Sequence, residues 1–421
     1  MIKIGILGVG TVGASVANIL KDNANILEAR AGEKISVKLG VVKNLSKDRG
    51  VDITLSDNPY DVINDPEIDI VVELMGGVQE PYKLVKDALK NGKSVVTANK
   101  ALLAYHRYEL QELAGDIPFS YEASTAGGIP IIGALRNGLS ANHIDSIKGI
   151  MNGTCNYMLT KMINEGANYD EILQEAQDLG YAEADPTFDV GGFDASHKLL
   201  ILASIAYGLD AKPEDILIEG IENITQTDVA FAKEFGYEIK LLGIAKRVGD
   251  GVELRVHSTM IPQSSMIAKV DGVMNAVTVV GDRVGETMYY GAGAGGDATA
   301  SAVISDIVNI VRGNHDPMLG YKKSLESGLR LLSRDEISSQ YYIRLEVDDE
   351  SGVLAQIAST LGKFDISIES MLQKPSKKED GVKLLFTTHI CKEIKMQDAL
   401  KALSNLQSVH DGMAMIRIEK N

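Results

Sequence analysis

Asp194 and Lys198 are the residues whose types and spacing most directly suggest chemistry. They stand four residues apart in segment 192–208 (GFDASHKLLILASIAYG), which is otherwise almost wholly apolar. Residues four apart share one face of a helix, and a helix that is apolar nearly all round is expected to be buried. An Asp–Lys pair is usually a solvated surface salt bridge, but burial argues against that environment here. The pair therefore indicates a functional cleft.

A second candidate site is the glycine-rich segment GVGTVG, which follows the first apolar run and precedes a helical pattern. Glycines at such a place permit a tight turn and let backbone N–H groups approach a pyrophosphate at a helix N-terminus. A glycine turn with a purely structural role is the alternative, but the strand and the helix on either side favour dinucleotide binding. The residues assigned to the cofactor are Gly8, Val9, Gly10, Thr11, Val12 and Gly13.

The end of the second expected strand bears on which dinucleotide is bound. NAD-selective sites usually carry Asp or Glu there, which accepts hydrogen bonds from the ribose and repels a 2′-phosphate. This strand instead ends in Val42-Lys43-Asn44. Lys43, helped by Lys47 or Arg49, could pair with a 2′-phosphate, or these cations could belong to a solvated face. We therefore expect NADP(H), with NAD(H) as the alternative.

Two further segments end neighbouring strands of the expected parallel sheet. They are residues 73–77 (ELMGG) and residues 97–100 (TANK). Both should lie at the carboxyl edge of the sheet, where ligands bind in such folds. Lys100 would then face the nicotinamide. A lysine in water at the start of a helix fits its position equally well, so its assignment depends on its context.

The elements that must position these residues are predicted from the alternation of apolar and polar patterns. Up to about residue 125, short apolar runs alternate with helical patterns, which is typical of a parallel α/β sheet. The runs lie at residues 4–7, 37–42, 70–74 and 94–97, and the helical stretches include 14–21 and 82–90. From about residue 128, helices are followed by alternating strands, which indicates a separate α+β domain. Residues 299–312 return to an apolar helix that could pack on the first sheet.

We expect an α/β protein with a Rossmann-type parallel sheet domain, an α+β substrate and dimerisation domain, and a C-terminal ferredoxin-like domain. The last is predicted from the order βαββαβ, with strands at 341–347, 366–372, 382–390 and 414–418 and helices at 353–363 and 396–403. The expected limits are residues 1–127 plus about 298–318 for the NAD(P)-binding domain, 128–297 for the catalytic domain, 319–338 for a polar linker, and 339–421 for the C-terminal domain.

Composition excludes several classes of protein. The 421 residues include 42 basic and 58 acidic ones, and the formal net charge of −16 argues against nucleic acid or an anionic membrane as the main partner. Cys155 and Cys391 are far apart, so neither a disulfide framework nor a zinc site is suggested. No apolar run is long enough to span a bilayer, and the first residues lack the features of a signal peptide. We expect a soluble, cytoplasmic protein.

Seven segments together closely resemble the homoserine dehydrogenase family. They occur in order across both expected enzyme domains, and several are long and specific, unlike a lone glycine loop. They are GVGTVG (8–13), ELMGG (73–77), TANKALLA (97–104), YEASTAGGIPII (121–132), MNGTCNYML (151–159), GYAEADPTFDVGGFDASHK (180–198) and GAGAGGDATASAVISDI (291–307). The resemblance implies interconversion of L-homoserine and L-aspartate 4-semialdehyde, in the aspartate pathway to threonine, methionine and isoleucine.

The resemblance also implies roles for single residues. Lys198 is the catalytic proton donor and acceptor and contacts the substrate, with Asp194 beside it and Lys100 as a second positive group at the reacting oxygen. Hydride transfer to an aldehyde carbon leaves negative charge on that oxygen, which two lysines can stabilise and protonate. Glu183 and Asp189 hold the substrate's amino group, since an ammonium seeks carboxylates. The alternative for these two is that they are loop acids in water.

The resemblance extends to the cofactor pocket, with a few departures. Gly76 and Gly296 complete the expected cofactor contacts, together with Lys43 and Lys100. A cysteine, Cys155, replaces the usual threonine of NGTTNY, and DA at 297–298 replaces a common leucine-proline. A reactive nucleophile is one interpretation of the cysteine, but no matching triad is evident and a packed, inert thiol is favoured.

The segment from residue 122 to residue 129 resembles the family's sodium site. In that site mostly backbone carbonyls of a glycine-rich turn bind a hard monovalent cation. Threonine 125 stands where valine is usual, which leaves a carbonyl ligand intact. The matching positions are Glu122, Thr125, Gly127 and Ile129.

Residues 341–373 resemble an ACT domain. The usual Asp-x-Pro-Gly-Val-Leu turn is present as DESGVL at 349–354, with serine in place of proline. Gly352 still offers a backbone N–H at a helix start for an amino-acid carboxylate, so the resemblance implies feedback binding of L-threonine. The alternative is a module that serves only dimerisation. Because ACT domains usually pair, we expect a homodimer or homotetramer.

Two other functions stand against this interpretation. The chain could be another ACT-containing NAD(P)-dependent dehydrogenase of an amino-acid pathway, such as one acting on a 2-hydroxy acid, but the segment with Asp194 and Lys198 does not support it. It could also be a catalytically silent amino-acid sensor that binds a nucleotide. The presence of Lys100, Glu183 and Lys198 argues against a silent sensor.

Overall fold

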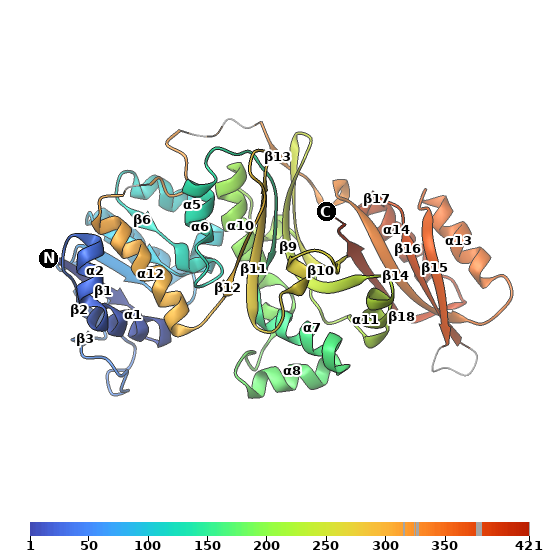
Figure 1. The fold of residues 1–421 in the computed structure, drawn as a ribbon, viewed down its shortest axis with the longest axis horizontal. Helices are drawn as coiled ribbons and strands as arrows, with labels where there is room; N and C mark the ends of the chain where they lie inside the picture. The colour runs from blue at the N-terminus through green and yellow to red at the C-terminus, as the bar shows by residue number, and fades with distance from the viewer. Residues whose placement is uncertain (315, 324, 326–327, 376–380, 421) are drawn as a thin grey trace. The chain divides into compact units, whose positions relative to one another are not determined.

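The computed structural model describes residues 1–314, 316–323, 325, 328–375 and 381–420 (Figure 1). The chain forms two compact units, each assembled from segments that are distant in sequence. The first unit comprises Met1–Gly153, Asp194–Glu214 and Val273–Leu329, and the second comprises Thr154–Phe193, Asp215–Gly272 and Arg330–Asn421. The domain limits expected from the sequence stay a prediction, and residues 324, 326 and 327 of the expected linker lie outside the described residues.

A six-stranded parallel sheet forms the centre of the first unit, as predicted. Its strand order, β3-β2-β1-β4-β5-β6, is that of a doubly wound dinucleotide-binding sheet. The central strands are apolar because both of their faces are covered; Ile4, Val72 and Val96, for example, are fully buried. The strands are β1 (Ile2–Leu7), β2 (Ile35–Val41), β3 (Leu55–Ser56), β4 (Ile70–Glu73), β5 (Ser94–Thr97) and β6 (Phe119–Ser120).

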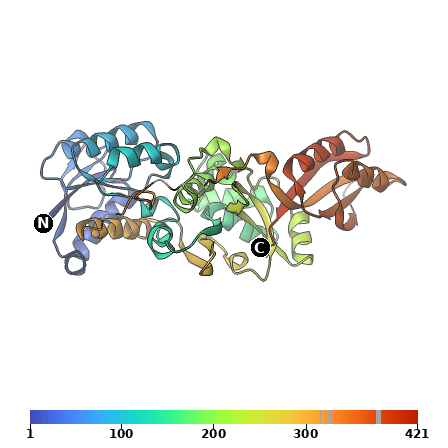
Figure 2. The same cartoon turned by 90° about the horizontal axis from the view of Figure 1, so that it is seen from above.

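Helices cover both faces of this sheet (Figure 2). On one face, α1 (Thr11–Asp22) and α12 (Gly296–Val311) share a single core with β1, in which Val303 and Ile307 are fully buried. The helix predicted over residues 299–312 therefore does pack on the first sheet. The remaining helices around the sheet are α2 (Ala24–Ala31), α3 (Tyr60–Ile63), α4 (Gln79–Lys90) and α5 (Lys100–Ala114).

The rest of the first unit includes one buried helix, α10 (Phe193–Tyr207). Every residue from Asp194 to Ile205 in α10 is buried, which confirms the burial expected from its apolar sequence. Three antiparallel strands are joined in the order β12-β11-β7. They are β7 (Ile144–Ile150), β11 (Met274–Gly281) and β12 (Gly285–Ala292), and short helical turns at Glu122–Ser124, Ile131–Gly133 and Ala134–Gly138 precede them.

The second unit contains the C-terminal domain, whose order of elements is the predicted βαββαβ (Figure 1). Within this unit the strands follow the order β9-β10-β18-β14-β16-β15. The C-terminal elements are β14 (Ser338–Asp348), α13 (Val353–Lys363), β15 (Ile368–Pro375), β16 (Gly381–Thr388), β17 (Cys391–Lys392), α14 (Glu393–Ser404) and β18 (Val409–Ile418). The others are α7 (Gly153–Glu165), α8 (Tyr169–Asp178), α9 (Thr187–Val190), β8 (Leu217–Ile218), α11 (Gln226–Glu234), β9 (Tyr237–Val248) and β10 (Gly251–Pro262).

Buried ion pairs connect the C-terminal domain to the rest of the second unit. Asp228, in the first turn of α11, accepts hydrogen bonds at 2.8 Å from Arg344 Nε and from the Tyr342 hydroxyl, both on β14. Strand β18 pairs in parallel with β10, so that Arg417 stands opposite Thr259.

Among the described residues, no helix is long and apolar enough to cross a membrane.

Candidate active site

The carboxylate of Asp194 lies between two lysine ammonium groups. Lys198 Nζ donates to Asp194 Oδ2 at 2.8 Å, and Lys100 Nζ is 3.0 Å from Oδ1. The side chain of Asp194 is 6% exposed, that of Lys198 11% and that of Lys100 35%, so solvent screens this cluster far less than a surface pair. The structure therefore brings together the three residues predicted to be catalytic.

The turn that follows β7 holds this cluster in place. Lys198 Nζ donates a second hydrogen bond to the carbonyl of Met151 at 2.6 Å. Asn152 Nδ2 donates to Asp194 Oδ2 at 3.0 Å. Sequence reasoning included these two residues in the MNGTCNYML segment but assigned them no function, although their place at a strand end was a usable signal. An ammonium has three N–H groups, so in the described part of the chain one N–H of Lys198 is left for a ligand.

The charges of the cluster sum to one net positive charge. Burial disfavours the ionised carboxyl of Asp194, but the ammonium groups of Lys198 and Lys100 outweigh it, so the pKa of Asp194 is lowered. The neighbouring His197 adds no charge near neutral pH, because burial lowers its pKa to about 4. Its ring packs edge-on against Tyr105, with ring centroids 5.7 Å apart. Such a site suits an oxygen on which negative charge develops.

A buried carboxylate fixes the loops that lead to Lys100. Glu73 ends β4 and is fully buried. Its Oε2 accepts a hydrogen bond from Thr97 Oγ1 at 2.5 Å, and its Oε1 accepts one from the N–H of Met75 at 2.8 Å. Asn99 Nδ2 lies 3.4 Å from Oε1. The carboxylate thus joins the ends of β4 and β5, immediately before α5 begins at Lys100.

Asn99 completes this arrangement by capping α5. Its Oδ1 accepts a hydrogen bond from the N–H of Leu102 at 3.0 Å, which satisfies one of the unpaired donors at the helix start. Its Nδ2 donates to the carbonyl of Gly77 at 2.9 Å. Burial raises the pKa of Glu73 to about 7. The hydrogen bonds from Thr97 and from the Met75 N–H favour ionisation, but burial outweighs them. Sequence reasoning placed both loops at the sheet edge but did not identify the acid that joins them.

The predicted cofactor site is a pocket at the carboxyl ends of β1, β2 and β4. Among the predicted residues, those that line it are Gly8, Val9, Gly10, Lys43 and Gly76. Arg49, Asp57 and Glu80 line it as well, and the last two were missed because they follow no motif. The Nε of Arg49 is buried and has no hydrogen-bond partner among the described residues. The pocket therefore offers cations beyond the glycine turn.

The glycines of the turn serve different purposes. Gly8 has φ 100°, and a Cβ there would lie 2.8 Å from the carbonyl of Leu74. A Cβ on Gly13 would lie 2.4 Å from the carbonyl of Gly8, so this glycine allows α1 to pack closely on β1. A Cβ on Gly10 would meet no atom within 4 Å. Only Gly10 therefore faces open space where a ligand can approach.

The other predicted cofactor residues lie elsewhere in the first unit. Thr11 and Val12 belong with Gly13 to the first turn of α1. A Cβ on Gly296, the first residue of α12, would lie 2.7 Å from Ser15 Oγ of α1, so the two helix starts are in contact. Lys100 joins the Asp194 cluster.

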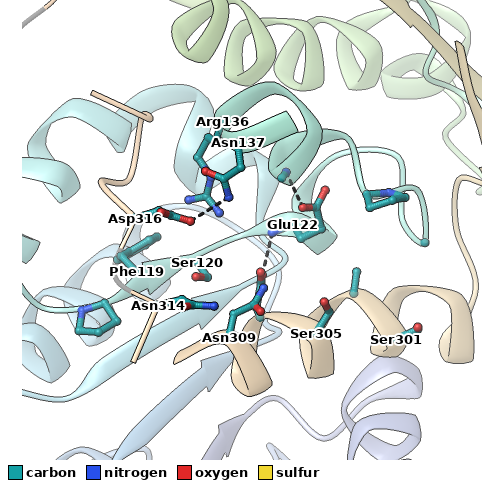
Figure 3. A pocket seen from close by; sticks show the side chains of 16 residues that line it. Phe119, Ser120, Glu122, Arg136, Asn137, Ser301, Ser305, Asn309, Asn314 and Asp316 are labelled. Atoms are coloured by element: carbon teal, nitrogen blue, oxygen red, sulfur yellow. Dashed lines mark hydrogen bonds between the residues drawn. The ribbon is translucent and has the colours of Figure 1, made fainter. Parts of the chain in front are cut away.

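A polar pocket lies between α12 and the segment from residue 118 to residue 137 (Figure 3). The carboxylate of Glu122 accepts hydrogen bonds at 2.7 Å from the N–H groups of Ile132 and Gly133, and the N–H of Glu122 donates to Asp306 Oδ2 at 2.8 Å. Burial raises the pKa of Glu122, and burial together with the charge of Glu122 raises the pKa of Asp306 to about 7. Two buried acids therefore share this pocket with Arg136.

The predicted sodium ligands lie in the turn beside this pocket. Within the part of the chain that the structure describes, no hydrogen bond reaches the carbonyls of Thr125 and Gly127, whereas those of Glu122 and Ile129 each accept one. Unengaged carbonyls in a tight turn are the type of ligand that a hard monovalent cation takes. No group of three or more His, Cys, Asp or Glu among the described residues could hold a metal ion. Sodium binding thus stays a prediction.

The predicted substrate acids belong to the second unit. Glu183 is exposed in the loop between α8 and α9, where its carbonyl accepts a hydrogen bond from Gln177 Nε2 at 3.1 Å. Asp189 is partly buried on α9, and its carbonyl lies 3.2 Å from Cys155 Sγ, which donates to it. Cys155 is buried and free of any disulfide, as expected for a packed thiol. The role of both acids stays a prediction.

Comparisons with known proteins agree along the whole chain. Family models match at residues 8–117 (homoserine dehydrogenase, NAD binding domain), 130–308 (homoserine dehydrogenase) and 341–407 (ACT domain). Homoserine dehydrogenase from Helicobacter pylori is 55% identical over 418 residues, covering 99% of each chain. That of Pseudomonas aeruginosa is 46% identical, covering 100% of this chain and 99% of its own. The crystal structure of a homoserine dehydrogenase from Thiobacillus denitrificans has a TM-score of 0.93 at 45% identity, covering 100% of this chain and 98% of that chain.

We predict that alanine substitutions at Gly10 and Gly13 will have different effects. Gly13→Ala forces α1 away from β1 and should lower the Tm by about 5 °C. Gly10→Ala should leave the Tm unchanged but weaken NADPH binding at least about tenfold, because its methyl group occupies the approach to the pyrophosphate. Thermal denaturation and a fluorescence titration with NADPH measure the two effects. Unchanged affinity in Gly10→Ala would contradict the assignment of this pocket.

A second prediction concerns the pH dependence of stability. Folding raises the pKa of Glu73 from 4.5 to about 7, so the stability that this acid contributes is complete below pH 4.5 and is lost as pH rises through about 7. Glu73→Gln cannot ionise, and its free energy of unfolding relative to wild type should rise between pH 4.5 and pH 8 by on the order of 3 kcal/mol. Urea denaturation at several pH values measures this, with the exposed Glu28→Gln as control. A pH-independent difference between variant and wild type would disprove it.

Proposed function

Because this chain belongs to the homoserine dehydrogenase family, we propose that it interconverts L-homoserine and L-aspartate 4-semialdehyde, with NADP(H) preferred over NAD(H). The observation that carries the proposal is the buried carboxylate of Asp194 between the ammonium groups of Lys198 and Lys100. A reaction that develops negative charge on an alcohol oxygen needs cationic donors at that atom. The proposed setting is the cytoplasmic aspartate pathway to threonine, methionine and isoleucine.

Lys198 is the residue proposed to exchange a proton with the substrate. Two of its N–H groups are held by Met151 and Asp194 at 2.6 and 2.8 Å, so the third can donate to the substrate oxygen. In the reduction Lys198 gives its proton to that oxygen, and in the oxidation of homoserine the neutral amine takes the proton back. Lys100 adds a second positive charge at the same oxygen. When bound, the nicotinamide supplies or accepts the hydride.

Glu183 and Asp189 are proposed to hold the substrate's ammonium. Both lie in the short segment that leads to Asp194, within 11 residues of it along the chain. Carboxylates are the expected partners of an ammonium. These acids are therefore proposed to recognise the ammonium of a small amino acid, and Lys198 is proposed to act on an oxygen of its side chain.

The preference for NADP(H) is proposed from the cations in the cofactor pocket. Lys43 and Arg49 both line it, and the buried Nε of Arg49 has no partner within the described part of the chain. A 2′-phosphate would supply the missing acceptor. Asp57 and Glu80 also line the pocket and oppose the phosphate, so the preference rests on contact of Lys43 and Arg49 with the 2′-phosphate and not on an excess of positive charge in the lining.

The ACT domain is proposed to bind L-threonine and to pair with a second copy in a homodimer or homotetramer. Gly352 has φ 96° and immediately precedes α13, so N–H groups at this helix start can hold an amino-acid carboxylate. A module used only for dimerisation would leave catalysis indifferent to threonine. Sodium is proposed at Glu122, Thr125, Gly127 and Ile129. Within the described residues no hydrogen bond reaches the carbonyls of Thr125 and Gly127, which supports these two as ligands.

The experiment that tests the reaction compares wild type with Lys198→Met. When L-homoserine and NADP are supplied, wild type should form NADPH, which is followed by its absorbance. The kcat of the variant should be at least about a hundredfold lower, because its proton donor is gone. Its affinity for NADPH should stay within about threefold. The control is Lys161→Met. Like Lys198, Lys161 lies on a helix and forms an ion pair with an acid four residues away, in this case Glu165.

Two outcomes would reject the proposal. A folded wild type that binds NADPH but does not oxidise homoserine would favour the silent sensor. Normal turnover by Lys198→Met would remove that residue from proton transfer.

A further prediction concerns the 2′-phosphate. Arg49→Ala and Lys43→Ala should each lower kcat/KM for NADP by up to about tenfold. The kcat/KM for NAD should stay within about twofold of the wild-type value. Lys47→Ala, which removes an exposed cation from the same loop, is the control. Steady-state kinetics with both cofactors at low and high salt measure the effect. Equal losses for NADP and NAD would show that the two cations do not read the phosphate.

A further inference from the structure

Arg417 and Glu219 form an ion pair that the proposed reaction does not use. Arg417 lies on β18 and is fully buried. Its Nη1 and Nη2 donate to the two carboxylate oxygens of Glu219 at 2.7 and 2.8 Å. Its Nε and Nη2 also donate to the carboxylate of Glu393, at 2.9 and 2.5 Å. One guanidinium therefore joins two carboxylates from distant parts of the second unit.

Glu393 connects this pair to the interior of the ACT domain. It is the first residue of α14, is buried, and accepts a hydrogen bond from the Tyr341 hydroxyl at 2.8 Å. Helices α13 and α14 share one apolar core, to which Ile357 and Met396 belong. Helix α13 begins at the proposed effector site. A displacement of α13 on effector binding thus has a short, packed route to the guanidinium.

Glu219 belongs to a turn that supports the segment around Asp189. The N–H of Ile221 donates to the carbonyl of Val190 at 3.0 Å. Gly192 has φ 85°, and a Cβ there would lie 3.3 Å from the carbonyl oxygen of Glu219, so the two backbones are in contact. The position of this turn therefore determines where the segment with the proposed substrate acid is held.

The two partners differ in how easily each can leave the pair. Arg417 is fully buried, and a buried guanidinium that loses a carboxylate is strongly destabilised. The side chain of Glu219 is 39% exposed and can be solvated instead. The pairing of β18 with β10 holds Arg417 in place. Glu219 is therefore the partner whose side chain can leave the ion pair.

From this geometry we infer that Glu219 is a positioning residue that transmits the state of the ACT domain to the substrate-binding segment through its pair with Arg417. With the pair formed, Asp189 is held for the substrate's ammonium. A shift of α14 on binding of the amino-acid effector displaces the Glu393 carboxylate at the guanidinium and weakens the pair of Arg417 with Glu219, and substrate affinity falls. The identities of substrate and effector rest on the proposed function, whereas the mechanical link between turn and segment does not.

The test uses the full-length Glu219→Gln variant, which keeps the side chain's size and removes its charge. The KM for L-homoserine should rise at least about fivefold with kcat within about twofold, and L-threonine should lose at least about fivefold in potency. Amide hydrogen exchange at Ile221 and Gly192 should be faster than in wild type, with or without ligands. Glu222→Gln, an exposed acid in the same turn, is the matched control and should behave as wild type.

Hydrogen exchange separates a failure of this inference from a failure of the proposed function. If wild type does not turn over homoserine, the function is wrong, but faster exchange confined to Glu219→Gln still supports the link. The inference is overturned if Glu219→Gln matches wild type in KM, threonine response and exchange. It is also overturned if kcat, KM and Tm all worsen while threonine potency is unchanged, because that result indicates a merely structural role. If threonine does not change the activity of wild type, the part of the inference that concerns regulation by the ACT domain is overturned.

Discussion

One buried carboxylate, that of Asp194, constrains most of the first unit. Its partners come from three places: Lys198 from the next turn of α10, Lys100 from the start of α5, and Asn152 from the turn after β7. Each must come within 3.0 Å of the same group. The end of the parallel sheet, the burial of α10 and the turn after β7 are therefore geometrically dependent on one another.

Burial makes this cluster both costly and useful. Each charge taken out of water carries a penalty of several kcal/mol before it is paired, and the hydrogen bonds from Asn152 and to the carbonyl of Met151 offset part of that penalty. The remaining net positive charge then acts in a medium of low dielectric constant, where its attraction for a developing oxyanion is stronger than in water. Below pH 7 Glu73, which joins the ends of β4 and β5, is mostly protonated and brings no buried anion to the sheet edge.

The sequence predicted the features that are local in the chain. The apolar run with Asp194 and Lys198 predicted a buried helix, and the alternation of apolar runs with helical patterns predicted a parallel sheet. The order of C-terminal elements predicted a ferredoxin-like domain. The structure confirms all three. Partnerships between distant residues could not be predicted this way. Glu73 and Thr97 are 24 residues apart, and Glu219 and Arg417 are 198 apart, so no periodicity or motif relates them.

The late position of α12 in the chain has a consequence for biosynthesis. Ile4, Ile6 and Val16 share a core with Val303 and Ile307, yet the ribosome makes the strands and helices of the sheet long before it makes α12 at Gly296–Val311. Until then, the nascent sheet has one apolar face without its final cover. Exposed apolar surface of this kind makes intermediates prone to aggregation. The first unit must therefore complete its folding late in translation or after it. Chaperones that shield apolar surface should raise the yield of folded protein.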